Sequence, residues 1–132
     1  METVYKAISR VLDSNDKIIS RVSVTGHFED NIPDEWTLFY QTLIPTVPII
    51  GKLFAFKTEQ DARDFVRKYG GSEIWKATTS RAKPAKFVAC ATPDIALFWG
   101  NDPYALTIPA PEGTLMCDDI TLTELLWERP LS

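Results

Sequence analysis

The sequence predicts an α+β fold: a single compact domain over residues 1–132, with mostly short antiparallel strands and one main helix at about residues 58–70. A length of 132 residues is that of about one domain, and no repeat, low-complexity tract or linker divides the chain. Short segments rich in Val, Ile and aromatic residues alternate with turn residues, as strands do. Only one stretch spaces its apolar residues as a helix does, and few helices among many short strands indicate α+β.

The first predicted unit is a hairpin. Val4–Leu12 and Lys17–Val24 are rich in Val and Ile, and they flank the sequence Asp13-Ser14-Asn15-Asp16. Side chains of Asp, Ser and Asn bond to their own backbone and favour turns. The polar stretch Gly26–Asp34 is then expected to be a loop, and the aromatic stretch Trp36–Leu43 a strand. Pro45 and Pro48 should stop that strand, because proline has no backbone donor.

The best-specified unit is a strand, a helix and a second strand. Leu53–Lys57 and Ser72–Thr79 read as the strands, and Thr58 stands where a helix N-cap is preferred. Acidic residues in the first turn and basic residues in the last suit the helix dipole, and Gly70-Gly71 is typical of a helix C-terminus. The expected core-facing stripe is Ala62, Phe65, Val66 and Tyr69.

The C-terminal third is expected to hold less regular structure. Lys86–Ala91 predicts a short strand, and Thr92-Pro93-Asp94 predicts the start of a helical turn that runs to Trp99. Asn101–Gly113 contains three prolines and is expected to be a long loop. Thr114–Trp127 is expected to close the chain as a strand with an irregularity at Asp118-Asp119.

Composition indicates a soluble globular protein, with 45% hydrophobic and 24% charged residues. The longest apolar run, Leu43–Ile50, is interrupted by prolines and falls short of the roughly 20 residues of a membrane span, so no membrane association is expected. The start Met1-Glu2-Thr3 lacks a basic and apolar leader pattern, which favours a cytoplasmic location. Cys90 and Cys117 are too few for a disulfide scaffold and read as buried thiols.

Residues with the spacing of known catalytic or metal sites are missing from the sequence. The glycine-rich phosphate-loop patterns are absent, and Gly70-Gly71 follows its helix instead of preceding it. His27 is the single histidine and reads as a solvated loop residue, so neither a metal site nor a Ser-His-Asp hydrolase is expected. Asp118-Asp119 alone is a weak signal for magnesium. We therefore expect no metal and no cofactor.

One enzymatic alternative depends on resemblance. The segments VYKAISR, LFAFKTEQDARDFVRK and EIWKATT resemble the layout of ADP-ribosyltransferase-like and RNA 2'-phosphotransferase-like domains. This resemblance implies an NAD-using enzyme in which Arg10 is the strand arginine. Thr79, within Thr78-Thr79-Ser80, would then stand in the family's Ser-Thr-Ser segment, and Glu124 would be the late catalytic glutamate. Leu122 stands where the family's ExE pattern has its first glutamate.

A second resemblance concerns provenance. Small hypothetical proteins of bacteriophages and mobile elements commonly show an early Tyr-Lys strand, an LF-x-F strand before a capped A-x-x-F helix, an E-I-W strand and a late P-x-G-T. This chain is similar to them over most of its length, through the matching motifs Tyr5-Lys6, Leu53–Phe56, Thr58 with Ala62 and Phe65, Glu73–Trp75, and Pro111 with Gly113-Thr114.

The charges are segregated along a chain of net charge -4. Arg67–Lys86 holds six basic residues and one acid, whereas Phe87–Glu128 holds seven acids and no Lys or Arg. In Val22–Gly51, all the charged residues are acidic. Blocks of one sign near aromatic residues favour recognition of a charged partner, because electrostatic attraction steers the encounter and aromatic side chains anchor it.

These observations favour a non-enzymatic module that binds a protein with a basic surface. The residues expected to bind it are Glu29, Asp30, Asp34, Glu35, Trp36, Asp118 and Asp119. Nucleic acid is the less favoured partner, because binders of nucleic acid are more often basic overall. With the second resemblance, the expectation sharpens to an inhibitor of a host defence or nucleic-acid-processing complex. The oligomeric state is left open.

Overall fold

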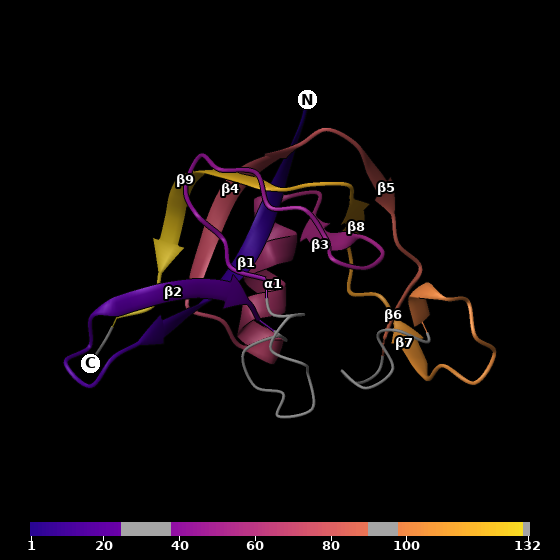
Figure 1. Cartoon of the computed structure of the whole chain (residues 1–132), viewed down its shortest axis with the longest axis horizontal. Helices are drawn as coiled ribbons and strands as arrows, with labels where there is room; N and C mark the ends of the chain where they lie inside the picture. The colour runs from indigo at the N-terminus through magenta and orange to yellow at the C-terminus, as the bar shows by residue number, and fades with distance from the viewer. Residues whose placement is uncertain (25–37, 90–97, 131–132) are drawn as a thin grey trace.

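The computed structural model describes residues 1–24, 38–89 and 98–130. It confirms the predicted α+β class: the chain is a single domain of mostly antiparallel strands with one helix (Figure 1). The elements are β1 Glu2–Leu12, β2 Ile18–Ser23, β3 Leu53–Phe56, α1 Glu59–Tyr69, β4 Glu73–Thr79, β5 Ala82–Pro84, β6 Phe87–Ala89, β7 Thr107–Pro109, β8 Thr114–Cys117 and β9 Thr121–Glu128.

The first strand lies in the middle of the main sheet. Seven strands form this sheet, with the order β5-β8-β3-β1-β4-β9 and with β2 also paired to β1. Tyr5 pairs with both β3 and β4, and Ile8 pairs with both β2 and β4. Strands β2 and β3 therefore share one side of β1, and β4 takes the other side. In Figure 1 the hairpin of β1 and β2 and the separate hairpin of β6 and β7 extend to opposite sides of the molecule.

The predicted opening hairpin is confirmed, with β1 starting two residues earlier than expected. The carboxylate of Asp13 accepts hydrogen bonds from the backbone N–H of Asn15 (2.8 Å) and Lys17 (3.0 Å), which fixes the turn. Asp16 adopts a φ of 61°, a conformation that Asp tolerates better than most residues. Local side-chain bonds thus set this register, as the sequence indicates.

Helix α1 is confirmed together with both of its caps. The Thr58 hydroxyl accepts a hydrogen bond from the Asp61 N–H at 3.1 Å, and the Gly70 N–H donates to the Val66 carbonyl at 2.9 Å. Ala62 and Val66 are buried against the sheet as predicted, and Phe65 is half-buried. The core-facing position expected for Tyr69 is wrong, because the side chain is 48% exposed.

The predicted strand at Trp36–Leu43 is also wrong over the residues that the structure describes. Residues 38–46 make single bridges to three different partners instead of a ladder: Val22 to Phe39, Thr42 to Leu122, and Thr46 to Ile120. A tight turn from Gln41 to Ile44 reverses the chain direction within this stretch, so no continuous pairing can form. The loop expected at Gly26–Asp34 lies outside the described residues.

Three expectations for the C-terminal third change. Within the described residues, the short strand expected at Lys86–Ala91 is present as β6. Its partner, β7, lies inside the segment Asn101–Gly113 that is predicted as a loop. β5 was not predicted. The closing segment is two strands, because the chain crosses at Asp118-Asp119 from β8, beside β3, to β9, beside β4. Phe98 and Trp99 are helical, and the start of that predicted turn lies outside the described part.

Hydrophobic cores lie on both faces of the sheet. Helix α1 covers one face, where Phe56, Val66 and Ile74 belong to a buried cluster. On the other face, Tyr40 packs with residues from β1, β3, β4, β8 and β9 in a larger cluster that includes Trp75 and Leu122. We call the irregular segment of residues 38–52 the crossing segment. It covers one face of the sheet, as helix α1 covers the other.

Candidate protein-docking surface

The crossing segment is held on the sheet by backbone hydrogen bonds at three points. The Tyr40 N–H donates to the Arg21 carbonyl (2.9 Å), and the Leu43 N–H donates to the Leu122 carbonyl (2.9 Å). Thr46 exchanges two bonds with Ile120, of 2.8 and 3.0 Å. Because these bonds tie the segment to β2 and β9, its side chains have defined directions despite the absence of a regular ladder.

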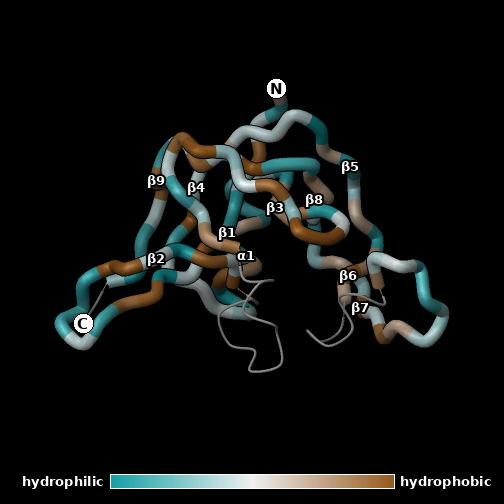
Figure 2. The backbone as a smooth tube through the Cα atoms, in the orientation of Figure 1, coloured by the Kyte–Doolittle hydropathy of each residue, from teal (hydrophilic) through white to brown (hydrophobic). Residues whose placement is uncertain are grey.

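Outward-facing apolar side chains follow the crossing segment. We call this set the apolar ridge: Phe39, Leu43, Ile44, Val47 and Ile49, each more than half exposed. Figure 2 shows hydrophobic stretches along this segment where it passes in front of the sheet. Single exposed apolar residues are common on protein surfaces, but a run of five on one anchored segment is typical of an interaction site.

The backbone at Leu43 departs from local preferences. Its φ of 66° lies in the left-handed region, where a bulky side chain clashes with the following carbonyl at a cost of about 1–2 kcal/mol. The turn is closed by a hydrogen bond from the Ile44 N–H to the Gln41 carbonyl at 3.3 Å. Gly or Asn would suit this position better. The strained turn instead carries a leucine that is 70% exposed, and strain at an exposed residue points to function more than to folding.

Buried polar groups support the segment from beneath. The ammonium group of Lys6 is 5.4 Å from the ring centroid of Tyr40, and Lys6 Nζ donates to the Phe54 carbonyl at 2.6 Å. Burial lowers the pKa of Lys6 to about 8 and raises the pKa of Tyr40. Burial also raises the pKa of the neighbouring Cys117 thiol to about 11. These groups are enclosed, so they position Tyr40 and cannot meet a substrate without rearrangement.

A fully buried carboxylate completes this support. Glu73 accepts hydrogen bonds from Arg21 Nε and from Trp75 Nε1, both at 2.8 Å. Arg21 also gives the carbonyl that holds Tyr40. The crossing segment is therefore anchored to a hydrogen-bonded group that is itself part of the core.

The predicted acidic surface is only partly within the described residues. Glu29, Asp30, Asp34, Glu35 and Trp36 lie outside them, as do His27 and Cys90, while Asp118 forms an ion pair with Lys52. Asp119 accepts hydrogen bonds from the Ser80 N–H (2.7 Å) and the Thr79 hydroxyl (3.2 Å). The Ser80 N–H is the main reason why the pKa of Asp119 is lowered. Both aspartates thus have partners within the chain, and Asp119 fixes the turn between β4 and β5.

The structure does not bring together the three residues of the transferase alternative. Thr79 is paired with Glu2 at the start of β1, whereas Arg10 lies near the other end of β1, eight residues further on. At about 3.3 Å per residue these positions are roughly 26 Å apart along the strand. Arg10 donates to the Arg129 carbonyl, and Glu124 is exposed on β9 opposite Lys76.

Sequence reasoning missed the apolar ridge, although one signal was present. The run Leu43–Ile50 is too short for a membrane span, and residues 38–43 have the composition of a strand, so neither pattern indicates an exposed surface. Apolar residues between Pro45 and Pro48 cannot join a regular ladder, so an exposed position was the remaining alternative to burial. Nothing in the local sequence indicates which of these side chains face outward.

The described part of the chain holds no group of three or more His, Cys, Asp or Glu side chains that could bind a metal ion. Within residues 1–24, 38–89 and 98–130, no helix has the length and apolar character to cross a membrane. Comparison of the chain with protein-family models, with curated protein sequences and with solved structures finds no match.

Proposed function

We propose that the chain is a non-enzymatic protein-binding module of the cytoplasm that anchors its partner on the apolar ridge. The observation that carries the proposal is Leu43: a strained backbone holds a large apolar side chain mostly in solvent, where it gives the fold little burial. Interfaces gain most of their energy from a few such anchors that become buried on binding. The hydrogen bonds to β2 and β9 keep the ridge in place before binding, which lowers the entropy cost of association.

The sequence around the ridge indicates the chemistry of the partner. Val22–Gly51 holds four acids and no Lys or Arg, and the ridge forms the second half of this stretch. An apolar anchor that follows acidic residues in the sequence suits a partner surface with an apolar pocket and a basic rim. Groove-lining surfaces of nucleic-acid enzymes are basic. Together with the resemblance to mobile-element proteins, this supports a host defence or nucleic-acid-processing complex as the partner that is inhibited.

The test is quantitative capture from bacterial lysate by the parent protein, by Leu43→Asn and by Leu106→Asn. Leu106 is a matched control, because it is 64% exposed but lies in the segment between β6 and β7. Asn suits the backbone of Leu43, so the ridge variant keeps its fold. We expect a protein that is recovered by the parent and by the Leu106 variant, and depleted at least about tenfold by the Leu43 variant.

Equal recovery by all three proteins would exclude the ridge as the docking site. An enzymatic outcome is separable from this one by incubating the protein with NAD and lysate. If the parent consumes NAD and Glu124→Gln does not, the transferase alternative replaces the binding module.

A further inference from the structure

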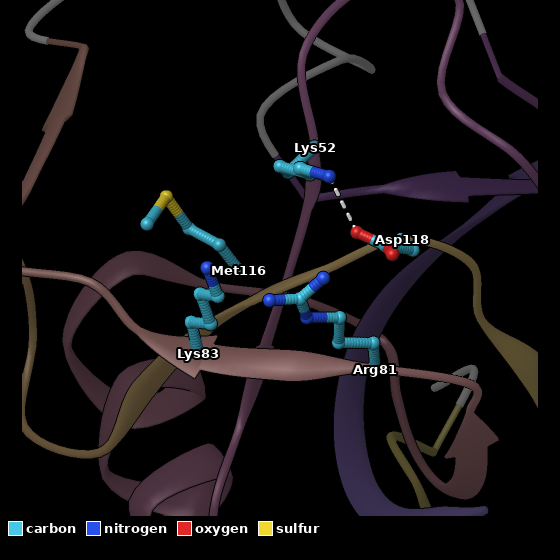
Figure 3. Close-up of a pocket in the computed structure, with 5 residues that line it drawn as sticks. All are labelled: Lys52, Arg81, Lys83, Met116 and Asp118. Carbon is cyan, nitrogen blue, oxygen red and sulfur yellow. Dashed lines mark hydrogen bonds and ion pairs between the residues drawn. The ribbon is translucent and has the colours of Figure 1, made fainter.

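A second surface feature is a cationic pocket at the other end of the sheet. Figure 3 shows its five lining residues, which we call the cationic pocket: Lys52, Arg81, Lys83, Met116 and Asp118. The cavity volume of the pocket is about 80 Å³. This volume is well below the roughly 300–1,000 Å³ of drug-sized ligand sites, so it suits one compact group and not an extended ligand.

Strand pairing brings these residues together from three parts of the sequence. Met116 in β8 is opposite Lys83 in β5 and opposite Phe54 in β3, so the three side chains form a row on one face. One step along, the Asp118 N–H donates to the Arg81 carbonyl (3.0 Å) and the Asp118 carboxylate pairs with Lys52. Lys83 and Met116 are therefore placed by the sheet, and Lys52, Arg81 and Asp118 each lie one residue beyond the end of one of these strands.

Aromatic packing makes the wall beside this row rigid. Phe54 stacks on Trp99 with ring centroids 5.5 Å apart, and Phe98 meets Trp99 edge-on at 4.7 Å. Trp99 also lies against Gly51, where an added Cβ would stand 2.0 Å from the indole ring. Because Phe54 and Gly51 both contact the indole, Trp99 supports the wall of the pocket.

The charges of the pocket do not balance. Its three cations face one carboxylate, and Lys52 already pairs with Asp118. Among the described residues, Arg81 and Lys83 form no ion pair with a carboxylate. A net positive charge of two thus gathers at one place in a chain whose overall charge is -4. Like charges so close together repel each other, which favours binding of an anion between them.

We propose that the cationic pocket binds one phosphate monoester group. Such a group carries a charge of about -1.5 to -2 at neutral pH, which matches the surplus of the pocket, whereas a carboxylate carries only half of it. The planar guanidinium of Arg81 can donate two parallel hydrogen bonds to phosphate oxygens, and Lys83 adds a mobile point charge. The group can belong to a small phosphorylated molecule or to the end of a nucleic-acid strand, which share this chemistry.

This site is separate from the proposed docking surface. The cationic row continues the face of β3 that carries Phe54 and Phe56, and Phe56 packs under α1. Tyr40 of the crossing segment packs on the opposite face with Leu53 and Ala55, and only the last residue of that segment, Lys52, belongs to the pocket. A defect of one surface should therefore leave the other intact, and Leu43→Asn serves as the variant that shows this.

The experiment is a titration of the ¹⁵N-labelled full chain at constant ionic strength, first with inorganic phosphate as the probe and then with acetate. We expect phosphate to shift the backbone amide signals of residues 81–83 and 116–118, and acetate to shift them far less. The double variant Arg81→Gln with Lys83→Gln should bind phosphate at least about tenfold more weakly. Lys17→Gln, an exposed lysine at the distant hairpin turn, and Leu43→Asn should bind as the parent does.

Two further arms separate the sources and protect against a folding artefact. If the phosphate group belongs to the end of a nucleic-acid strand, an oligonucleotide with a 5'-phosphate should compete with phosphate better than the same oligonucleotide with a 5'-hydroxyl. If it belongs to a small molecule, a nucleoside monophosphate should also compete with phosphate. Lys83→Gln alone, on an exposed edge strand, gives a milder variant. Equal shifts with acetate, unchanged binding in both pocket variants, or an equal loss in Lys17→Gln would overturn the proposal.

Discussion

The two faces of the sheet are covered in different ways. On one face, α1 follows local rules throughout: its cap, its charged ends and its terminal glycine are the residues that a helix prefers. On the other face, the crossing segment has no ladder, exposes the five apolar side chains of the ridge and contains a leucine with positive φ. Residues that depart from local preference without a gain in burial are expected at functional sites. The comparison thus supports the proposal that the crossing face serves recognition, whereas the helix face serves folding.

Glu73→Gln should have the largest effect on stability. The buried carboxylate pairs with Arg21 and accepts from Trp75, and breaking a buried pair costs about 3–5 kcal/mol. Arg21 is partly exposed and can regain water, so we expect about 3 kcal/mol by chemical denaturation. Glu124→Gln, on the neighbouring strand and exposed, should change the free energy of unfolding by less than about 0.5 kcal/mol. Equal losses would show that Glu73 does not anchor the crossing face.

Phe65→Ala should have the next largest effect and tests the helix face. Truncation of a fully buried phenylalanine to alanine lowers the free energy of unfolding by about 3–5 kcal/mol. Because Phe65 is half-buried, we expect a loss of about 2 kcal/mol. Its ring contacts Phe56 and Tyr69, each at 5.0 Å between centroids. Tyr69→Ala should cost less than about 1 kcal/mol because that ring is largely in solvent. A larger loss for Tyr69 than for Phe65 would reverse the assigned orientation of α1.

The pH dependence of stability should report on the groups beneath the crossing segment. Burial lowers the pKa of Lys6 to about 8 from 10.5, so above pH 8 the unfolded chain binds more protons at this site. Stability should therefore rise between about pH 8 and 9, by at most about 1.4 kcal/mol. Above pH 9 the raised pKa of Cys117 acts in the opposite direction, since the folded state then keeps its proton longer.

Lys6→Met should remove the rise between pH 8 and 9. Cys117→Ala should remove the opposing contribution that begins near pH 9, and the contribution of Tyr40, whose pKa is also raised, should remain above about pH 10. Urea denaturation at half-unit steps of pH measures both. A rise that persists in Lys6→Met would assign it to another group.

The smallest effect on stability is expected for Leu43→Asn. Asn tolerates positive φ, and the leucine side chain gives little burial, so stability should stay constant or rise by up to about 1 kcal/mol. The same change should abolish partner capture. If Leu43→Asn destabilises the protein by more than about 1 kcal/mol, Leu43 serves packing and the difference between the two faces disappears.

Local signals predicted the elements that depend on local contacts. The hairpin turn at Asp13, the cap at Thr58 and the glycine after Tyr69 act within a few residues, and all appear in the structure. Strands β5 and β7, three residues each, exist only because distant strands pair with them, so no local pattern marks them. The break at Asp118-Asp119 was foreseen as an irregularity, but its size depends on pairing of β8 and β9 with different strands.

The candidate sites were predicted less completely, for the same reason. Counting charges along the chain found Arg81 and Lys83 in a basic block and placed Asp118 in an acidic one. Pairing of β3, β8 and β5 places Arg81, Lys83 and Asp118 beside Lys52, which belongs to neither block of charge along the sequence. The apolar ridge was missed because a pattern of apolar residues predicts burial, and the side that an irregular segment presents is decided by tertiary contacts.

The central place of β1 determines the order in which the sheet can form. Glu2 pairs with Thr79 in β4, so β1 is not flanked on that side until the chain has been made as far as β4. Closing a loop of this length is slow compared with forming the adjacent hairpin. During synthesis, the hairpin of β1 and β2 must therefore persist with one open edge, which is where a nascent chain is most exposed to wrong pairing. Refolding should accordingly be limited by docking of β4 onto a hairpin that is already formed.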